Sequence, residues 1–436
     1  MGEKTYNIKR SFSDLNIIYI GNFIDFLEFG LFTALLPFLS KDLLGQYDPH
    51  FRAELGYLAV YIGFMGRPIG AFFLGKLGDL YGSQRLLVFS VLGISIISLI
   101  VAFLPSSNPY IIPMVLVCRF LQGVFTGAEY SAVVICSTQT KTTHTSYRSV
   151  AFMTASGILG VAVAQLIAFL LSLIDSPMVS WRHAFVAVSV IGFITFLKRA
   201  LSYQSNWQPL SRQSVSLRPY IPEIMMIVVL VGFANSMFYL VNTFINNYKM
   251  IINTNLVASQ FLLNLISTAF FAFSVVCWAF YLERNKYPPV KLMKLGMFIM
   301  ALLLGPLFYA YVQGLSLWAS VLIQMVFIIG MQLFTLVSIS FVPRIFPEAI
   351  RIQACGLSFN LGISLLGGSF PYISLCLTEA THNLYMPAVY TFLLIVLGHV
   401  SLKYLMSRQN SRSNFHLAAF PNCDDKNSGK KLSMSL

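Results

Sequence analysis

The sequence contains few charged residues, few cysteines and no large hydrophilic block. Asp, Glu, Lys and Arg make up 10% of its 436 residues, whereas a soluble protein typically carries about 25%, so an ordinary soluble domain is excluded. The six cysteines form no CxxC pair and have no histidine at ligand spacing; we interpret them as small buried apolar residues and expect no metal site. The chain also lacks a Ser/His/Asp set and a GxxxxGKS or GxxxxGKT loop. We therefore expect neither an enzyme nor ATP-driven transport, and no cofactor.

Apolar residues make up 57% of the chain, and this composition predicts an all-α membrane protein. In lipid, every backbone polar group must be hydrogen-bonded within its own segment, which favours spanning helices of about 20 residues. Twelve segments meet this requirement: 14–40, 54–76, 84–104, 110–137, 147–174, 183–203, 221–248, 256–282, 291–312, 316–341, 351–378 and 385–406. The opening stretch MGEKTYNIKR is polar, and no small-residue cleavage site follows the first apolar run. We therefore expect no cleaved signal peptide.

The 29 Lys and Arg residues predict the orientation of these helices. If the N-terminus is inside, Arg67 and Arg119 fall within helices, and only four basic residues fall on the outer side: Lys41, Arg52, Arg182 and Lys249. All the others, including Lys198 and Arg199 at the end of the sixth segment, then lie on the cytoplasmic side, which carries the basic excess of membrane proteins. We therefore expect both termini in the cytoplasm. The net charge of +13 reflects this bias and not a nucleic-acid partner.

Two features recur in the two halves of the chain and indicate a parallel duplication. Asp79 and Glu283 each follow an apolar run at its cytoplasmic edge, and Arg148 and Arg351 each open a helix, at nearly the same spacing. Transporters built from two such halves bind substrate between them near the bilayer midplane. The predicted domains are a six-helix bundle at 1–203, a cytoplasmic linker at 204–220, a second six-helix bundle at 221–406 and a disordered tail at 407–436.

The stretch GNFIDFLEFG places Asp25 and Glu28 in the middle of the first apolar segment. A charge near the bilayer centre costs roughly 2.5–3.5 kcal/mol, so such residues normally face a cavity and have partners. Arg119 is expected at a similar depth, with Arg67 and Glu129 deeper toward the cytoplasm. One interpretation is a transport site; the alternative is a set of ion pairs that fix helix packing.

The balance of these charges suggests a proton carrier. Three acids share two arginines, so one carboxylate lacks a cation, and burial favours its neutral form. Our order of candidates for proton coupling is Glu28, Asp25 and Glu129. Neutralised acids would free Arg119 to hold a carboxylate of the substrate through a planar two-point contact. Binding of the proton and of the substrate would then support each other.

Amides and tyrosines supply further candidates for substrate contact. The first half offers Asn22, Gln122, Tyr130 and Tyr19 near the charged cluster. The second half offers Asn235, Asn242, Asn264, Gln324, Gln332 and Asn360, of which we favour Asn235 and Asn360. The alternative for each amide is a hydrogen bond between helices. Pairs of glycines, Gly66 with Gly70 and Gly123 with Gly127, are typical of helices that approach closely.

Four strings of the sequence resemble one transporter family in the order in which that family carries them. GKLGDLYGSQR resembles the G-x-L-x-D-R-x-G-R-R/K loop of the major facilitator superfamily. Four strings resemble motifs of its metabolite:proton symporters: GNFIDFLEFGLF, GRPIGAFFLGKLGD, CRFLQGVFTGAEY and RIFPEAIRIQACGLSFNLG. This family includes proline/betaine, α-ketoglutarate, citrate and shikimate permeases. The loop departs from the pattern at Leu80, Ser83 and Gln84, and the helix departs at Phe26, where the family has Trp. The two acids of the helix are also exchanged in kind.

The same loop predicts a gate at the cytoplasmic surface. An acid at this position can pair with cations or with a helix N-terminus of the neighbouring bundle. Asp79 is therefore the central gating candidate, and the supporting candidates are Arg67, Gly82, Arg85, Glu283, Arg284 and Arg351, with Gly78 beside them.

The resemblance implies a proton-coupled secondary transporter that imports a small polar metabolite, a carboxylate or a zwitterion, by alternating access. We expect a multi-pass protein of the cell membrane, the inner membrane in a bacterium, acting as a monomer on an organic acid or osmolyte. The alternatives are a transporter of drugs or citrate-type siderophores, in either direction, and a sensor that binds without flux. Helix 5 lacks the G-x-x-x-G-P-x-x-G-G pattern of proton-antiporting exporters, which favours import.

Overall fold

The computed structural model describes residues 12–47, 49–106, 108–138, 143–173, 180–201, 216–245, 257–313 and 317–412. Within these ranges every regular element is helical, which confirms the all-α prediction. The long helices are α1 (Phe12–Ala34), α3 (Pro49–Tyr81), α4 (Ser83–Ala102), α5 (Ile111–Thr138), α6 (Thr143–Leu173), α7 (Trp181–Leu201), α8 (Ile221–Tyr239), α10 (Val257–Asn285), α11 (Pro289–Val312), α12 (Leu317–Phe341) and α15 (Met386–Arg412). The shorter elements are α2 (Leu36–Leu43), α13 (Arg351–Gly362), α14 (Phe370–Thr381) and the turns η1 (Arg218–Tyr220), η2 (Leu240–Phe244), η4 (Val342–Ile345), η5 (Glu348–Ile350) and η6 (Ile363–Gly367).

Eleven segments of the described chain are long and apolar enough to cross a membrane. They correspond to the predicted segments from the second to the twelfth: Leu58–Tyr81, Ser83–Ala102, Ile111–Thr138, Ser146–Leu171, Trp181–Leu201, Arg218–Asn242, Leu265–Asn285, Pro289–Val312, Val321–Ile345, Glu348–Thr378 and Met386–Arg408. The first predicted span is not among them, so the twelfth crossing stays a prediction. Most of the predicted tail and linker lies outside the described residues.

Two of the predicted segments are divided. The first, 14–40, breaks at Leu35, and Pro37 stands in the first turn of α2, a place where its missing N–H costs nothing. The eleventh, 351–378, is divided into α13 and α14 by the π-helical turn η6. In that turn the amide of Gly368 donates to the carbonyl of Ile363 over 2.7 Å. Apolar length alone does not reveal such breaks.

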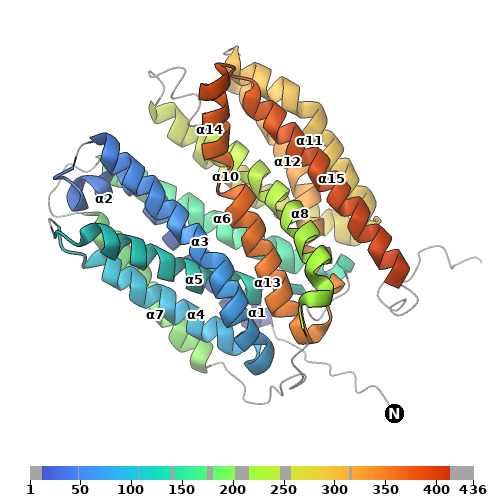
Figure 1. Ribbon diagram of the computed structural model, residues 1–436, viewed down its shortest axis with the longest axis horizontal. Coiled ribbons are helices and arrows are strands. Elements are labelled where there is room, and N and C mark those ends of the chain that lie inside the picture. The colour runs from blue at the N-terminus through green and yellow to red at the C-terminus, as the bar shows by residue number, and fades with distance from the viewer. Residues whose placement is uncertain are drawn as a thin grey trace, which may run out of the picture.

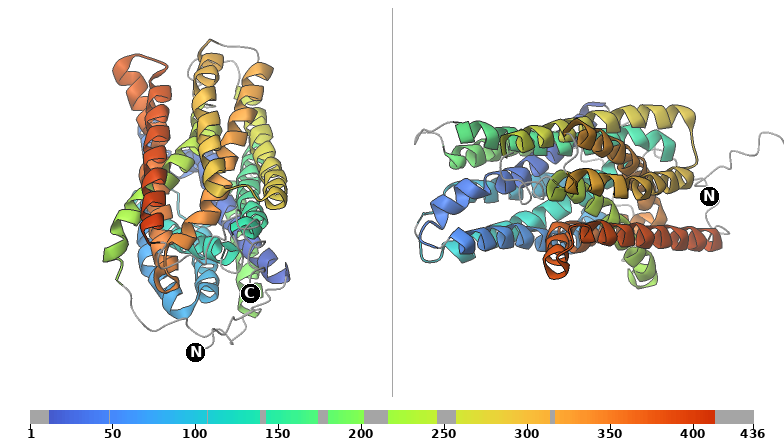
Figure 2. Two further views of the ribbon diagram at one scale, coloured as in Figure 1. Left: turned by 90° about the vertical axis from the view of Figure 1, so that its right-hand side faces the viewer. Right: turned by 90° about the horizontal axis from the view of Figure 1, so that it is seen from above.

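The helices run side by side along one common direction (Figure 1, Figure 2). The blue and cyan helices of the first part lie on one side of Figure 1, and the orange and red helices of the last part lie on the other. The most extensive contacts between these parts are those of α3 along α13 and of α6 along α10, and α5 with α13 and α6 with α12 add smaller ones. These contacts bring segments from distant parts of the sequence together.

The closest helix approach is between α3 and α5. A side chain at Gly70 would meet the backbone of Val124, and one at Gly127 would meet the backbone of Arg67. The predicted glycine pairs therefore face each other, and they let the two backbones touch. Large apolar side chains such as Phe273 and Phe298 are mostly exposed on the outside. This is the surface that lipid would cover.

Candidate functional site

Three buried side chains form a hydrogen-bonded group between α1 and α5. Arg119 Nη1 lies 3.3 Å from Glu28 Oε1, and both side chains are 1% exposed. The same Nη1 donates to Gln122 Oε1 over 2.7 Å, and Gln122 Nε2 donates to Glu28. The Arg119 guanidinium also lies 4.0 Å from the ring centre of Phe32. Arg119 is thus held by an acid, an amide and a ring within the first half of the chain.

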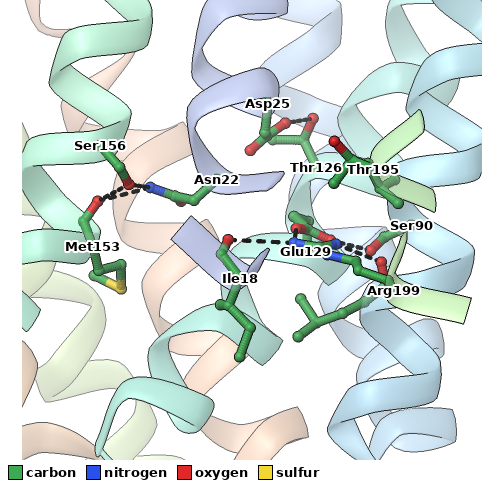
Figure 3. Close-up of polar contacts among 12 residues, drawn as sticks. Ile18, Asn22, Asp25, Ser90, Thr126, Glu129, Met153, Ser156, Thr195 and Arg199 are labelled. Carbon is green, nitrogen blue, oxygen red and sulfur yellow. Dashed lines mark hydrogen bonds and ion pairs between the residues drawn. The ribbon is translucent and has the colours of Figure 1, made fainter. Parts of the chain in front are cut away.

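Asp25 lies one helical turn before Glu28 and has a different environment. Its Oδ1 accepts a hydrogen bond of 2.6 Å from Thr126 Oγ1 of α5 (Figure 3). Its Oδ2 is buried without a hydrogen-bond partner. Arg67 exerts the strongest electrostatic attraction on Asp25 of any cation, yet no ion pair joins the two.

Arg67, a gating candidate from sequence, is buried in the middle of α3. Its guanidinium lies 4.9 Å from the ring centre of Phe29 and 5.2 Å from that of Phe64. The Phe64 ring is 5.9 Å from that of Tyr239 in α8. The carbonyl of Phe64 also accepts a hydrogen bond from Ser364 of η6. Arg67 therefore lies where the two halves of the chain meet.

Glu129 is paired with a cation that the sequence analysis assigned to the cytoplasmic surface. Arg199 Nη2 lies 2.7 Å from Glu129 Oε1, and Ser90 donates to the other carboxylate oxygen (Figure 3). Arg199 also donates to the carbonyl groups of Leu87 and Ile18, so one guanidinium connects α1, α4, α5 and α7. Three buried acids of this region therefore have three buried arginines and not two. The end of an apolar helix gave no sign that Arg199 turns inward.

The polar candidates of the first half point in different directions. Asn22 reaches toward α6, whereas Asp25 reaches toward α5 (Figure 3). Asn22 Nδ2 donates to the carbonyl of Met153 and to Ser156 Oγ, both in α6. Tyr130 is buried, and its ring lies 6.4 Å from Phe26. Asn22 is thus separated from the charged residues.

Tyr130 also extends toward the second half of the chain. Its ring lies 6.1 Å from that of Phe359 in α13. Tyr19 lies 6.3 Å from Phe152 of α6. Aromatic rings therefore connect the charged region of α1 and α5 with the helices that approach it from the second half.

The amides of the second half mostly bond to neighbouring backbone. Asn360 Nδ2 donates to the carbonyl of Gly127 over 3.2 Å and so connects α13 with α5. Asn235 donates to Val231 and Asn242 to Phe238, each one turn earlier in its own helix. Asn235 is partly exposed. Gln324 donates to Val241 and Gln332 to Phe271, in each case connecting two helices of the second half; the side chain of Asn264 lies outside the described residues.

Asp79 meets the N-terminus of a helix from the other half. Its Oδ1 accepts from the amide of Ile352 over 3.0 Å, and its Oδ2 accepts from the amide of Gln353 over 2.9 Å. Those amides belong to the first turn of α13, where backbone N–H groups have no partner within the helix. A carboxylate at this place is also favoured by the helix dipole. The sequence predicted that Asp79 pairs either with cations or with a helix N-terminus, and the structure shows the helix N-terminus.

Glu283 and Arg148 make the equivalent contact between α10 and α6. Arg148 Nε lies 2.6 Å from Glu283 Oε2, and the Arg148 guanidinium lies 4.4 Å from the ring centre of Phe280. The side chains are 47% and 22% exposed, so water screens this pair. The two residues that the duplication marks in the first half, Asp79 and Arg148, thus both contact the second half.

The remaining gating candidates lie around these contacts. Gly82 has a φ of 102°, a left-handed conformation that favours glycine, and it connects α3 to α4. Arg351 donates to the carbonyl of Phe346 and lies 3.6 Å from Glu348, so it stays within its own segment. Arg85 and Arg284 are exposed.

The chain is similar to one protein family and to transporters of known name. Residues 18–371 match the model of the Major Facilitator Superfamily. The proline/betaine transporter of Escherichia coli (strain K12) is 25% identical over 415 residues, which cover 88% of this chain and 81% of that protein. The glycine betaine/proline/ectoine/pipecolic acid transporter OusA of Dickeya dadantii (strain 3937) is 23% identical over 435 residues, covering 90% and 82%.

A solved structure has the same fold. The proton:xylose symporter XylE bound to 6-bromo-6-deoxy-D-glucose superimposes with a TM-score of 0.74 at 14% identity, covering 91% of this chain and 95% of that one. A partially occluded inward-open conformation of XylE from E. coli gives a TM-score of 0.64.

Proposed function

This chain belongs to the Major Facilitator Superfamily, and on that premise we propose that it is a proton-coupled symporter which imports a small zwitterionic or carboxylate metabolite. It is a multi-pass membrane transporter and not an enzyme. Relatives that align with this chain over about four fifths of their own length carry proline and betaine in their names. Zwitterions of this size are therefore the first substrates to test.

The contact of Glu28 with Arg119 carries the proposal. The Glu28 carboxylate is 1% exposed, and Arg119 and Gln122 stabilise its negative charge. Binding of a proton to Glu28 would therefore change the Glu28–Arg119 ion pair directly. Protonation of Glu28 would remove its charge and weaken its hold on Arg119. A proton bound from outside would thus change the charges next to the substrate. Protonation of Glu28 would in this way link the proton gradient to transport.

The contacts of Asp79 and Glu283 support alternating access. Both contacts join the two halves of the chain at one end of the helices. From the distribution of Lys and Arg residues, we assign this end to the cytoplasm. While these contacts hold, substrate would enter from the outside. Their rupture would open the cytoplasmic side. Proton and substrate binding would bias this equilibrium only through a difference in affinity for the two states.

The topology of the proposed transporter has twelve spans, with α1 as the first. The bundles are 1–203 and 221–406, connected by 204–220, with both termini in the cytoplasm and the protein acting as a monomer. Labelling of single cysteines from either side of the membrane tests this topology.

Uptake into proteoliposomes tests the function. We expect purified protein to accumulate radiolabelled proline or glycine betaine when the outside is made acidic, and to lose accumulation when the pH gradient is collapsed. Efflux driven by an opposite gradient would favour export instead. Binding without flux under any gradient would contradict transport.

A further inference from the structure

Two charged residues remain without an ionic partner when the buried charges of the first half are paired. Glu28 is paired with Arg119, and Glu129 is paired with Arg199. Asp25 and Arg67 are left over, and neither has an ion pair among the described residues. A buried acid and a buried base that attract each other yet make no ion pair can each take up the opposite charge of a ligand.

Arg67 has the properties of a site for an anionic group. Its side chain is 5% exposed, against 1% for Arg119. Its Nε is buried without a hydrogen-bond partner. Its contacts in the described chain are the rings of Phe29 and Phe64, which attract the guanidinium but accept no conventional hydrogen bond. The donor fork is thus free for a carboxylate, which it fits in a bidentate manner.

Asp25 has the matching properties for a cationic group. One of its oxygens accepts from Thr126, which fixes the carboxylate in place. The other oxygen is buried without a partner. Glu28 differs, because Arg119 and Gln122 both contact its Oε1 and Arg119 already pairs with its charge. Asp25 is therefore the acid of this group that makes no ion pair in the described chain.

The place of Arg67 suits a substrate that lies between the two halves. Phe64, which contacts the Arg67 guanidinium, also contacts Tyr239 of α8 and accepts a hydrogen bond from Ser364 of η6. Tyr130, one turn beyond Thr126, contacts Phe359 of α13. Aromatic rings of both halves therefore border the region of the two unpaired charges. Such rings also favour the apolar body and the cationic end of a small zwitterion.

We propose that Arg67 and Asp25 are the two charged ends of a zwitterion-binding site, Arg67 holding the carboxylate of the substrate and Asp25 its ammonium group. Arg119, which the sequence favoured as the carboxylate ligand, stays with Glu28 and serves proton coupling. A zwitterion neutralises both unpaired charges at once, whereas a simple anion would leave Asp25 uncompensated. The inference rests on the proposed transport function and specifies its substrate class.

Two sets of probes of equal shape test the two ends of the site. Proline is compared with prolinamide, which lacks the carboxylate, and with cyclopentanecarboxylate, which lacks the amine. Glycine betaine is compared with choline and with 3,3-dimethylbutyrate in the same way. Binding of each probe to the purified full-length protein is measured by calorimetry and by the rise of its melting temperature.

We expect the wild-type protein to prefer a zwitterion over both partial analogues by about 10- to 100-fold, the range of a hydrogen bond to a charged group. Arg67→Gln should lose the preference for proline over prolinamide and keep the preference over cyclopentanecarboxylate. Asp25→Asn should do the reverse. Arg67→Lys should fall between Arg67→Gln and wild type, because it keeps the charge without the planar fork.

Arg182→Gln is the matched control. Arg182 is paired with Asp42 near the outer end of α7, and its replacement should leave all preferences unchanged. The melting temperature of the unliganded protein separates binding from packing. Since Arg67 makes no hydrogen bond or ion pair in the described chain, Arg67→Gln should melt close to the wild-type temperature; a large drop would assign Arg67 to structure and overturn its role as a ligand.

The outcomes separate this inference from the proposed function. If the wild type binds a zwitterion and Arg67→Gln keeps the full preference for its carboxylate, the assignment of Arg67 is wrong while the transport function stands. If cyclopentanecarboxylate binds as tightly as proline, Asp25 has no role in binding. If no zwitterion binds the wild type, both the site and the substrate class proposed above are wrong.

Discussion

The three buried acids around α1 differ in what compensates their charge. Glu28 has an ion pair with an arginine and a bond to an amide, and Glu129 has an ion pair with an arginine and a bond to a hydroxyl. Asp25 has a bond to a hydroxyl and the attraction of Arg67, without an ion pair. Burial penalises the ionised form of all three, but a cation at hydrogen-bond distance offsets that penalty. Our proposals accordingly assign coupling to Glu28, helix attachment to Glu129 and ligand binding to Asp25.

Glu28→Gln should uncouple transport from protons. The amide keeps the shape of the side chain and a hydrogen bond to Gln122, but it no longer responds to pH. We expect exchange of labelled substrate across proteoliposomes to persist while accumulation falls to the level seen without a pH gradient. Full proton-driven accumulation by Glu28→Gln would disprove its role and leave Asp25 and Glu129 as candidates.

Arg199→Met should destabilise the protein, because Glu129 would remain buried without its cation. Breaking a buried pair from one side costs roughly 3 kcal/mol, and here two carbonyl groups also lose a donor. Melting of the purified protein measures this loss. The double variant Glu129→Gln with Arg199→Met should recover much of it. A double variant no more stable than the single one would argue against the pair.

At the scale of the helices, α13 is held at its first turn and interrupted at its end. Asp79 of α3 binds the amides of Ile352 and Gln353 at the start. The π-helical turn η6 separates α13 from α14. The part of this span before η6 is thus attached to the first half of the chain, and the part after η6 is a separate helix.

Removal of the Asp79 cap should shift the conformational equilibrium. A helix cap contributes about 1 kcal/mol, which corresponds to roughly a fivefold change in an equilibrium constant. Asp79→Ala should therefore slow turnover more than it weakens binding, and Asp79→Asn, which can still accept one bond, should have a smaller effect. Turnover and binding are measured separately by uptake and calorimetry. Loss of binding with unchanged turnover kinetics would place Asp79 in the site.

The contact of α3 with α5 predicts a difference between two glycines. Gly70→Ala would place a methyl group against the backbone of Val124, and overpacking of this kind costs about 1–3 kcal/mol. Gly305→Ala is the control, since nothing lies within 4 Å of its added carbon, and better helix propensity should stabilise it by up to about 1 kcal/mol. Thermal unfolding compares the two. Equal effects would mean that the helices are not in close contact.

At the scale of the whole molecule, two unlike contacts close the same end. The first is the partly buried cap of α13 by Asp79, and the second is the ion pair of Arg148 with Glu283, whose side chains are 47% and 22% exposed. An exposed ion pair contributes only about 0.2–1 kcal/mol. The cap is therefore the stronger of the two, and the pair is the one that salt weakens.

A cysteine at Ser131 should report on this closure. Ser131 is buried on α5, next to Gly356 and Asn360 of α13. In a background without the six native cysteines, Ser131→Cys should react slowly with a membrane-impermeant maleimide applied from the cytoplasmic side. The rate should rise with Glu283→Gln, more with Asp79→Ala and most with both. Rapid labelling without either change would show that this end is already open.

The sequence alone determined the all-α fold, most helix boundaries and the superfamily. Apolar length and helical hydrogen bonding are local properties, so the segments 84–104 and 110–137 match α4 and α5 almost to the residue. The motif strings also singled out Asp79, which lies in the last turns of α3, because the sequence pattern that marks it is local. Asp25 and Glu28 could also be found from the sequence, because two acids within an apolar segment are a local pattern.

The tertiary structure alone decided which charge meets which. Arg199 lies at the end of an apolar segment and has the local pattern of a cytoplasmic anchor, yet it turns inward to Glu129, 70 positions away. The number of arginines that share the acids, and hence the identity of the unpaired residues Asp25 and Arg67, depends on the rotation of each helix about its axis. That rotation is set by contacts such as Gly127 against Arg67 and Asn360 against Gly127. These contacts join residues that are far apart in the chain, and no local pattern encodes them.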